Sequence, residues 1–143
     1  MTWIVAANTN DCRIYHLNEK EKTLTLIKEI NHPENKKKAS EYLTSDKPGH
    51  YHAGAAHGAY EPHTDPKEVQ INDFARLIAH ALNKGRNDNA FSKLMIIALP
   101  HMSGLLAKHL DKHVSELITK TIHKEVLQMS EKELMAFLQE HQR

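Results

Sequence analysis

The amino-acid sequence predicts an α/β domain in which helices lie on the faces of a mixed five-stranded β-sheet. Five apolar or β-branched segments have the length of strands, and segments with apolar residues every three or four positions lie between and after them. The elements follow in the order β-β-β-α-β-α-β-α, a meander followed by two helical crossovers. The chain has 143 residues, of which 40% are hydrophobic and 26% are charged, so one domain with its own core is expected over residues 1–143.

The first three strands are expected at residues 3–7, 12–17 and 23–30. The first segment is apolar without interruption, as in a strand that is buried on both faces. The second alternates along its length, and the third is rich in β-branched residues. Short polar turns join the three segments, so they are expected to form an antiparallel meander.

A helix is expected at residues 66–84. Asp65 is a good N-cap, Pro66 suits the first helical position, and Glu68 completes the pattern of a capping box. Gly85 is expected to end the helix in the left-handed conformation. The apolar residues at helical spacing are Ile71, Phe74, Ala75, Ile78, Ala81 and Leu82.

The second half of the chain supplies two further strands and two further helices. In order, the sequence predicts a buried strand at 94–99, a helix that begins at Ser103 and Gly104, and a turn capped by Asp111. A strand is expected at 117–123, with a helix as the alternative, and a final helix begins at a capping box of Ser130 and Glu133. Right-handed crossovers place the fourth strand parallel to the first and the fifth strand beyond it. The expected order is 3-2-1-4-5, the arrangement of ribonuclease H-like domains.

Residues 31–64 contain no periodic element and are expected to form a long loop rich in glycine and histidine. Its candidate metal ligands are His50, His52, His57 and His63. Imidazoles bind Zn²⁺, Ni²⁺ or Cu²⁺, but no cysteine joins this set and the spacing matches no standard zinc motif. Two interpretations stay open: a solvated loop with no cofactor, and a loop that binds Zn²⁺ or Ni²⁺ weakly.

Composition narrows the possible functions. The formal net charge is +1, so no overall field attracts the chain to nucleic acid or to a membrane. Cys12 is the single cysteine, which excludes an intramolecular disulfide, and no clear base lies beside it to activate a nucleophile. No apolar run approaches the roughly 20 residues of a membrane span. Residues 1–7 lack the basic flank of a signal peptide, so a cytoplasmic protein is expected, with signal-independent export left open.

A candidate ligand site lies where the first and fourth strands are expected to end. Ligands of α/β sheets favour the carboxyl ends of parallel strands, and Asn8 and His101 follow two such strands. Amide groups near Ser103 and Gly104, at the expected start of a helix, are positioned to hold an anion. The alternative is ordinary turn chemistry, in which these residues only end strands and begin a helix.

Several segments resemble the bacterial host attachment protein family, whose members are required for attachment to host cells. They occur in the family's order over nearly the whole chain, at residues 2–7, 12–15, 72–76, 83–85, 94–100, 104–106, 123–126 and 130–134. That family is similar in fold to the middle domain of eukaryotic and archaeal class-1 peptide release factors. In those domains a Gly-Gly-Gln loop precedes a helix with a Phe-Ala-Arg segment, which here corresponds to residues 74–76 and makes Arg76 a candidate ligand-binding residue.

Departures from these relatives limit what the resemblance implies. No Gly-Gly-Gln occurs, and Gln70 lies within the predicted helix, so peptide release is not expected. Asn8 stands where family members often carry aspartate, and no carboxylate precedes Asp11, so two-metal nuclease chemistry is not expected either. The resemblance implies a translation-associated, non-catalytic binding module that contacts the ribosome, tRNA or other RNA. The alternatives are a metal-dependent hydrolase that uses the histidine-rich loop, and an interaction protein with a partner on the host surface.

Overall fold

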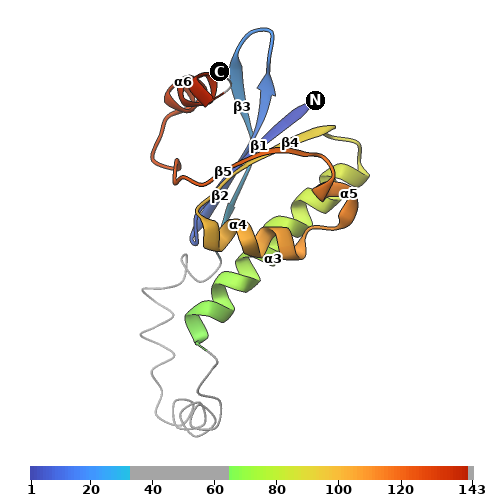
Figure 1. Ribbon diagram of the computed structural model, residues 1–143, viewed down its shortest axis with the longest axis vertical. Coiled ribbons are helices and arrows are strands. Elements are labelled where there is room, and N and C mark those ends of the chain that lie inside the picture. The colour runs from blue at the N-terminus through green and yellow to red at the C-terminus, as the bar shows by residue number, and fades with distance from the viewer. Residues whose placement is uncertain (33–64, 142–143) are drawn as a thin grey trace, which may run out of the picture.

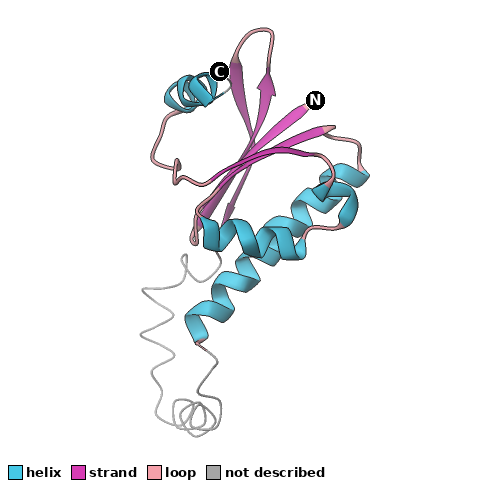
Figure 2. Ribbon diagram, viewed as in Figure 1, coloured by secondary structure: helices cyan, strands magenta, loops and turns pink. Residues whose placement is uncertain are grey.

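The computed structural model describes residues 1–32 and 65–141, which form a five-stranded sheet with helices on both faces (Figures 1 and 2). In order, the elements are β1 (Thr2–Ala7), β2 (Asp11–Asn18), β3 (Thr23–Asn31), α3 (Pro66–Asn87), β4 (Lys93–Ile97), α4 (Pro100–His109), α5 (Lys112–Ser115), β5 (Ile118–Ile122) and α6 (Glu131–His141). The predicted mixed α/β class and element order are confirmed. Most of the predicted loop at 31–64, with its four candidate metal ligands, lies outside the described residues.

The sheet has the order β3-β2-β1-β4-β5, as the sequence predicts. β1 pairs antiparallel with β2 and parallel with β4, and every one of its residues is buried. Val5 at its centre lies opposite Ile14 on one side and Ile96 on the other. The uninterrupted apolar run at the start of the sequence is therefore the central strand of the sheet.

Three helices cover one face of the sheet, and α6 covers the other (Figure 1). The crossovers from β3 to β4 and from β4 to β5 run in the same direction across the sheet, so right-handed connections place α3, α4 and α5 on the same side. Phe74 and Leu106 belong to the core on that side, together with Val5. Leu134 and Leu138 of α6 belong to the core on the opposite side.

The start of α3 is as predicted, but its end is not. The side chain of Asp65 accepts a hydrogen bond of 2.9 Å from the backbone N–H of Lys67. The helix continues through Gly85 to Asn87, and no described glycine has a positive φ, so the prediction of a left-handed stop at Gly85 is wrong. Gly85 instead lies against Trp3: a Cβ added to it would be 2.8 Å from Cη2 and Cζ3 of the indole ring. Close approach of the β1 side chain explains this glycine.

The start of α4 also differs from the prediction. The helix begins at Pro100, with Leu99 as an extended N-cap, rather than at Ser103 and Gly104. The backbone N–H of Ser103 donates to the carbonyl of Leu99 at 2.9 Å, so it already belongs to the helical hydrogen-bond pattern. Proline ends a strand but is equally suited to the first turn of a helix, where its missing N–H costs nothing.

The remaining caps are confirmed. Oδ1 of Asp111 accepts from the N–H of Val114 at 2.9 Å and caps α5. Ser130 and Glu133 form the predicted reciprocal capping box before α6, with distances of 2.9 and 3.1 Å. These are contacts between residues three positions apart, which explains why the sequence alone predicts them.

Each edge strand carries a β-bulge. On β3, Leu26 lies opposite Tyr15 and Lys28 lies opposite Ile14, which leaves Ile27 as an extra residue. On β5, Thr119 is the extra residue, because Ile118 and Lys120 lie opposite two consecutive residues of β4. Bulges interrupt and twist an edge, and so reduce open-ended pairing of exposed strands.

Candidate functional site

The predicted ligand site lies at the end of the sheet where Asn8 follows β1. Both polar atoms of the Asn8 side chain are hydrogen-bonded. Oδ1 accepts from the N–H groups of Asn10 and Asp11 at 2.8 and 2.7 Å. Nδ2 donates to Oε1 of Glu125 at 2.7 Å. Asn8 therefore closes the turn between β1 and β2 and joins it to the segment that follows β5.

Glu125 continues this network toward α6. Its second oxygen accepts from the N–H of Leu127 at 3.1 Å, and the carbonyl of Leu127 accepts from Nη1 of Arg13 at 2.9 Å. Nε of Arg13 donates to Glu29 on β3 at 3.2 Å. The hydrogen bonds to Glu29 and Tyr15 raise the pKa of Arg13 above its usual value, so the guanidinium stays charged. The network fixes the connection between β5 and α6 against β2 and β3.

His101 bonds to a different partner. Its Nε2 lies 3.0 Å from Oε2 of Glu68, and this pair joins the first turn of α4 to the first turn of α3. Both side chains are about half exposed, at 55% and 53%. Glu68, which was predicted to complete a capping box with Asp65, thus directs its carboxylate to the neighbouring helix.

The other predicted ligand-binding residues are not assembled around Asn8 or His101. Ser103 and Gly104 lie within α4, and a Cβ on Gly104 would meet no atom within 4 Å. Because the helix begins at Pro100, the predicted basis for anion binding at these two amides is wrong. Arg76 is exposed on α3, where Nη1 lies 3.9 Å from Asp73. Within residues 1–32 and 65–141, no side-chain hydrogen bond joins any two of the five predicted residues.

The predicted metal ligands His50, His52, His57 and His63 lie outside the described residues, so their role stays a prediction. In the part of the chain that the structure describes, no group of three or more His, Cys, Asp or Glu residues is placed to hold a metal ion. Two histidines of the folded part link elements of the structure. The ring of His32 is buried, lies 2.9 Å from the carbonyl of Gln70 and contacts the ring of Phe74. His109 lies 2.8 Å from Oδ1 of Asn72 and links α4 to α3.

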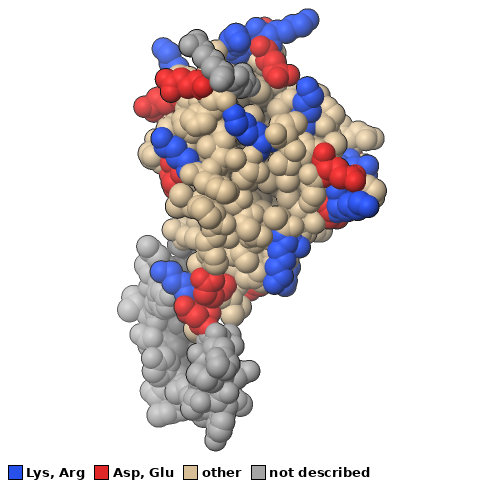
Figure 3. Space-filling view, in the orientation of Figure 1, with Lys and Arg blue, Asp and Glu red and all other residues tan. Residues whose placement is uncertain are grey.

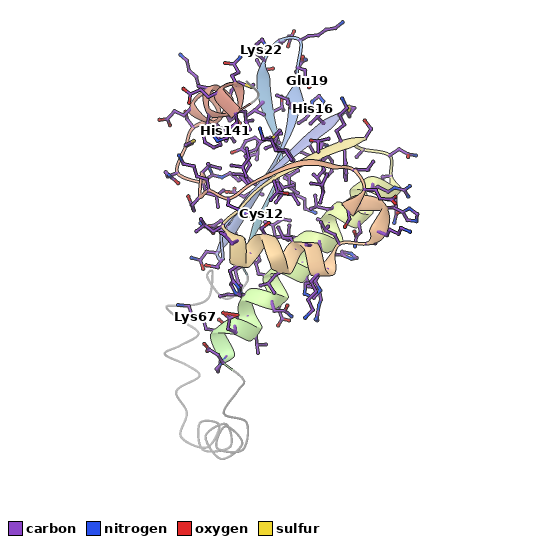
Figure 4. All side chains as sticks on the ribbon, viewed as in Figure 1. Cys12, His16, Glu19, Lys22, Lys67 and His141 are labelled. Carbon is purple, nitrogen blue, oxygen red and sulfur yellow. The ribbon has the colours of Figure 1, made fainter. Side chains whose placement is uncertain are left out.

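Cys12 is fully buried beneath the helices (Figure 4). Burial, with a smaller effect from Asp11, raises the pKa of its thiol to about 12. The reactive thiolate is therefore scarce at neutral pH, in agreement with the expectation that Cys12 is not a nucleophile.

Two grooves flank the edge strand β3. One has a volume of about 440 Å³ and lies between the start of β3 and α6, with Leu24, Met135 and Ala136 among its lining residues. The other has a volume of about 270 Å³ and lies between the end of β3 and α3. Neither groove contains a predicted site residue. Sequence periodicity could not have indicated them, because each combines a strand with a helix that lies far away along the chain.

The surface carries no large region of one charge on the face shown in Figure 3, where acidic and basic side chains are interspersed around uncharged residues. This agrees with the formal net charge of +1. No helix in the described residues has the length and apolar character needed to cross a membrane.

Comparison with known proteins identifies relatives of the chain. It is 31% identical over 107 residues to the uncharacterized protein RP470 of Rickettsia prowazekii (strain Madrid E), an alignment that covers 73% of this chain and 66% of that protein. A solved structure described as an archaeal protein covers 98% of this chain and 36% of its own chain, with 10% identity and a TM-score of 0.47. The chain thus spans just under two thirds of the Rickettsia relative and about a third of the archaeal chain. The predicted relation to release-factor middle domains stays a prediction.

A protein family described as "Protein required for attachment to host cells" matches residues 3–138, nearly the whole sequence. The match includes β2 to β5, most of β1, and the caps of α3, α5 and α6. The chain therefore belongs to the host attachment family.

Proposed function

We propose that the chain is a non-catalytic binding module that supports attachment to host cells. The family supplies the link to attachment. The proposal that the module is non-catalytic is supported by the hydrogen-bond network at the end of the sheet. There, Asn8 and Glu125 bond to each other and to backbone N–H groups.

A side chain that acts in general acid–base catalysis lies within hydrogen-bond distance of the reacting group. Here both oxygens of Glu125 and both polar atoms of Asn8 hold the chain together, at distances of 2.7–3.1 Å. Every buried side-chain nitrogen or oxygen in residues 1–32 and 65–141 has a hydrogen-bond partner. This pattern supports a stabilising role for the network.

We propose a protein partner in preference to RNA. Binding to RNA draws much of its strength from clustered Lys and Arg side chains. The net charge of +1 and the interspersed charges favour short-range contacts with a protein instead. Ribosome or tRNA association, which the release-factor resemblance implies, is the competing proposal. We also propose that the module works in the cytoplasm and supports attachment indirectly, with no resident cofactor.

The test uses cells of the producing organism that lack the chain. Wild type and a Glu68→Gln variant are each returned to these cells, and attachment to host cells is measured. Glu68→Gln removes the carboxylate that pairs with His101 in a half-exposed acid–base pair, and changes the shape of the side chain little. We expect equal attachment with both, whereas a folded Glu68→Gln variant that fails to restore attachment would contradict the non-catalytic role.

Cell fractionation decides where the module works. We expect the chain in the cytoplasmic fraction, protected from protease added to intact cells. Digestion by that protease would instead support display toward the host surface. Sedimentation with ribosomes at low salt, lost at high salt, would support the RNA alternative over a protein partner.

A further inference from the structure

The groove between β3 and α3 has the form of a site for an extended peptide. Its volume is about 270 Å³, and its lining residues are Lys28, Glu29, Ile30, Asn31, Leu77, His80, Ala81 and Lys84. One wall is an edge strand, and the other is the outer side of a long helix. Leu77 of α3 lines the groove and is 41% exposed, so it offers apolar surface to a partner.

The strand wall offers backbone groups to a partner. Among the described strands, β3 pairs only with β2, so the N–H and C=O groups along its other side lack a strand partner. The bulge at Ile27 interrupts this edge, but the four residues from Lys28 onward pair regularly with β2. Those four residues are the strand residues that line the groove. A regular segment of this length suits the addition of one short strand.

The charges of the groove favour an acidic partner. Lys28 and Lys84 stand on opposite walls of the groove. Glu29 points to the other face of the sheet, because neighbours along a strand alternate, and its carboxylate is bonded to Arg13. Lys84 pairs with Asp88 at 2.8 Å, but both side chains are more than half exposed, and exposed pairs of this kind exchange partners at little cost. Ile30, Leu77 and Ala81 contribute apolar side chains to the lining of the groove.

We propose that this groove binds an extended peptide segment of a partner protein, which adds to β3 as a strand at residues 28–31. An apolar side chain of the peptide packs against Leu77, and neighbouring carboxylates approach Lys28 and Lys84. Backbone hydrogen bonds supply affinity, and the groove supplies preference for the apolar and acidic side chains. The inference rests on the proposed function, because it names the partner class of a binding module.

The α3 surface offers a matched control for this proposal. Leu77 and Val69 are apolar residues of the same helix with similar exposure, 41% and 45%, but only Leu77 lines the groove. Glutamate at either position adds one negative charge to a surface that is already solvated, so both variants are expected to fold. Thermal unfolding and circular dichroism of Leu77→Glu and Val69→Glu verify this before binding is measured.

The probe is a library of short random peptides displayed on phage and selected on the purified full chain. Enriched peptides are synthesised without counter-selection on any variant, and their affinities are measured by fluorescence polarisation. We expect sequences with an apolar residue flanked by acidic ones. Leu77→Glu and Lys28→Glu should each weaken binding about tenfold or more, which corresponds to loss of one good contact, whereas Val69→Glu should leave it unchanged. Amide exchange should slow at residues 28–31 when the peptide binds.

Several results would overturn the proposal. One is a library in which no peptide is enriched. Another is enriched peptides that bind Leu77→Glu and Val69→Glu equally, or that protect amides in the α6 groove instead of β3. Self-association of the chain that Leu77→Glu abolishes would assign the groove to a second copy. None of these results alters the attachment measured with Glu68→Gln, so failure of this inference and failure of the proposed function are distinguishable.

Discussion

The contact between Gly85 and Trp3 gives the sharpest test of how α3 packs on the sheet. A Cβ on Gly85 would lie 2.8 Å from two atoms of the indole ring and 3.2 Å from the ring of Phe91. The indole ring has little room to move, because Trp3 is only 9% exposed and its ring centroid lies 4.7 Å from that of Phe91. Gly85→Ala therefore forces a shift in packed aromatic rings.

Two opposing effects determine how much Gly85→Ala changes the free energy of unfolding. Alanine favours an interior helical position over glycine by about 1 kcal/mol. Inserting a methyl group into a packed core costs roughly 1–3 kcal/mol. We therefore expect Gly85→Ala to lower the free energy of unfolding by about 0–2 kcal/mol, although helix propensity alone predicts a gain.

Urea denaturation of a double-mutant cycle isolates the contact. In a Trp3→Phe background the smaller ring leaves room, so Gly85→Ala should become neutral or stabilising, with a coupling energy of about 1–3 kcal/mol between the two positions. Gly104→Ala is the control, because Gly104 is exposed on α4 with no atom near its missing Cβ. That substitution should stabilise the protein by roughly 0.5–1 kcal/mol. A stabilising Gly85→Ala in the wild-type background, or no coupling with Trp3, would refute the packing described here.

Three further predictions concern the core, a cap and the histidine-rich loop. Phe74 is 1% exposed at the centre of the α3 core, so Phe74→Ala should cost about 3–5 kcal/mol in urea denaturation, and a loss below about 1 kcal/mol would contradict its placement. Hydrogen bonds from Ser130 lower the pKa of Glu133 below its usual 4.5, so the stability they supply is present at neutral pH and is lost as pH falls through that lowered pKa. Glu133→Ala should therefore destabilise the protein at pH 7 and less so in acid, because it removes the carboxylate that accepts from Ser130; an equal effect at both pH values would argue against the capping box. Calorimetry with Zn²⁺ should show binding with a dissociation constant on the order of micromolar at best, and weaker binding below about pH 6. Tight one-to-one binding that is lost in a His50→Ala/His52→Ala variant would instead favour a metal-dependent activity.

Local patterns in the sequence predict the elements and most of their caps. Asp65, Asp111 and the pair of Ser130 and Glu133 are all confirmed, because each cap joins residues two or three positions apart. The order of the sheet also follows from the sequence, since short turns force an antiparallel meander and crossovers have a fixed hand. At Pro100 the sequence allows two outcomes, and the structure selects the start of a helix over the mere end of a strand.

The candidate site was predictable only in part. Asn8 was expected after β1 and lies there, but its partner Glu125 is 117 residues away in sequence, and no periodic pattern connects them. The same holds for His101 and Glu68, whose distance depends on how α4 lies beside α3. A long-range pair is set by the packing of two elements, and each element alone is compatible with several neighbours.

The sequence by itself determined the α/β class, the strand order, the caps and the membership of the host attachment family that its motifs indicate. These features depend on the spacing of apolar residues, on the residues that form turns and on the direction of the connections, all of which follow from residues close together in the sequence. Tertiary structure decided why Gly85 is a glycine, which partners Asn8 and His101 bond, and where grooves flank β3. Those features arise from close-packed side chains that are distant in sequence, and such packing is fixed only when helices and sheet come together.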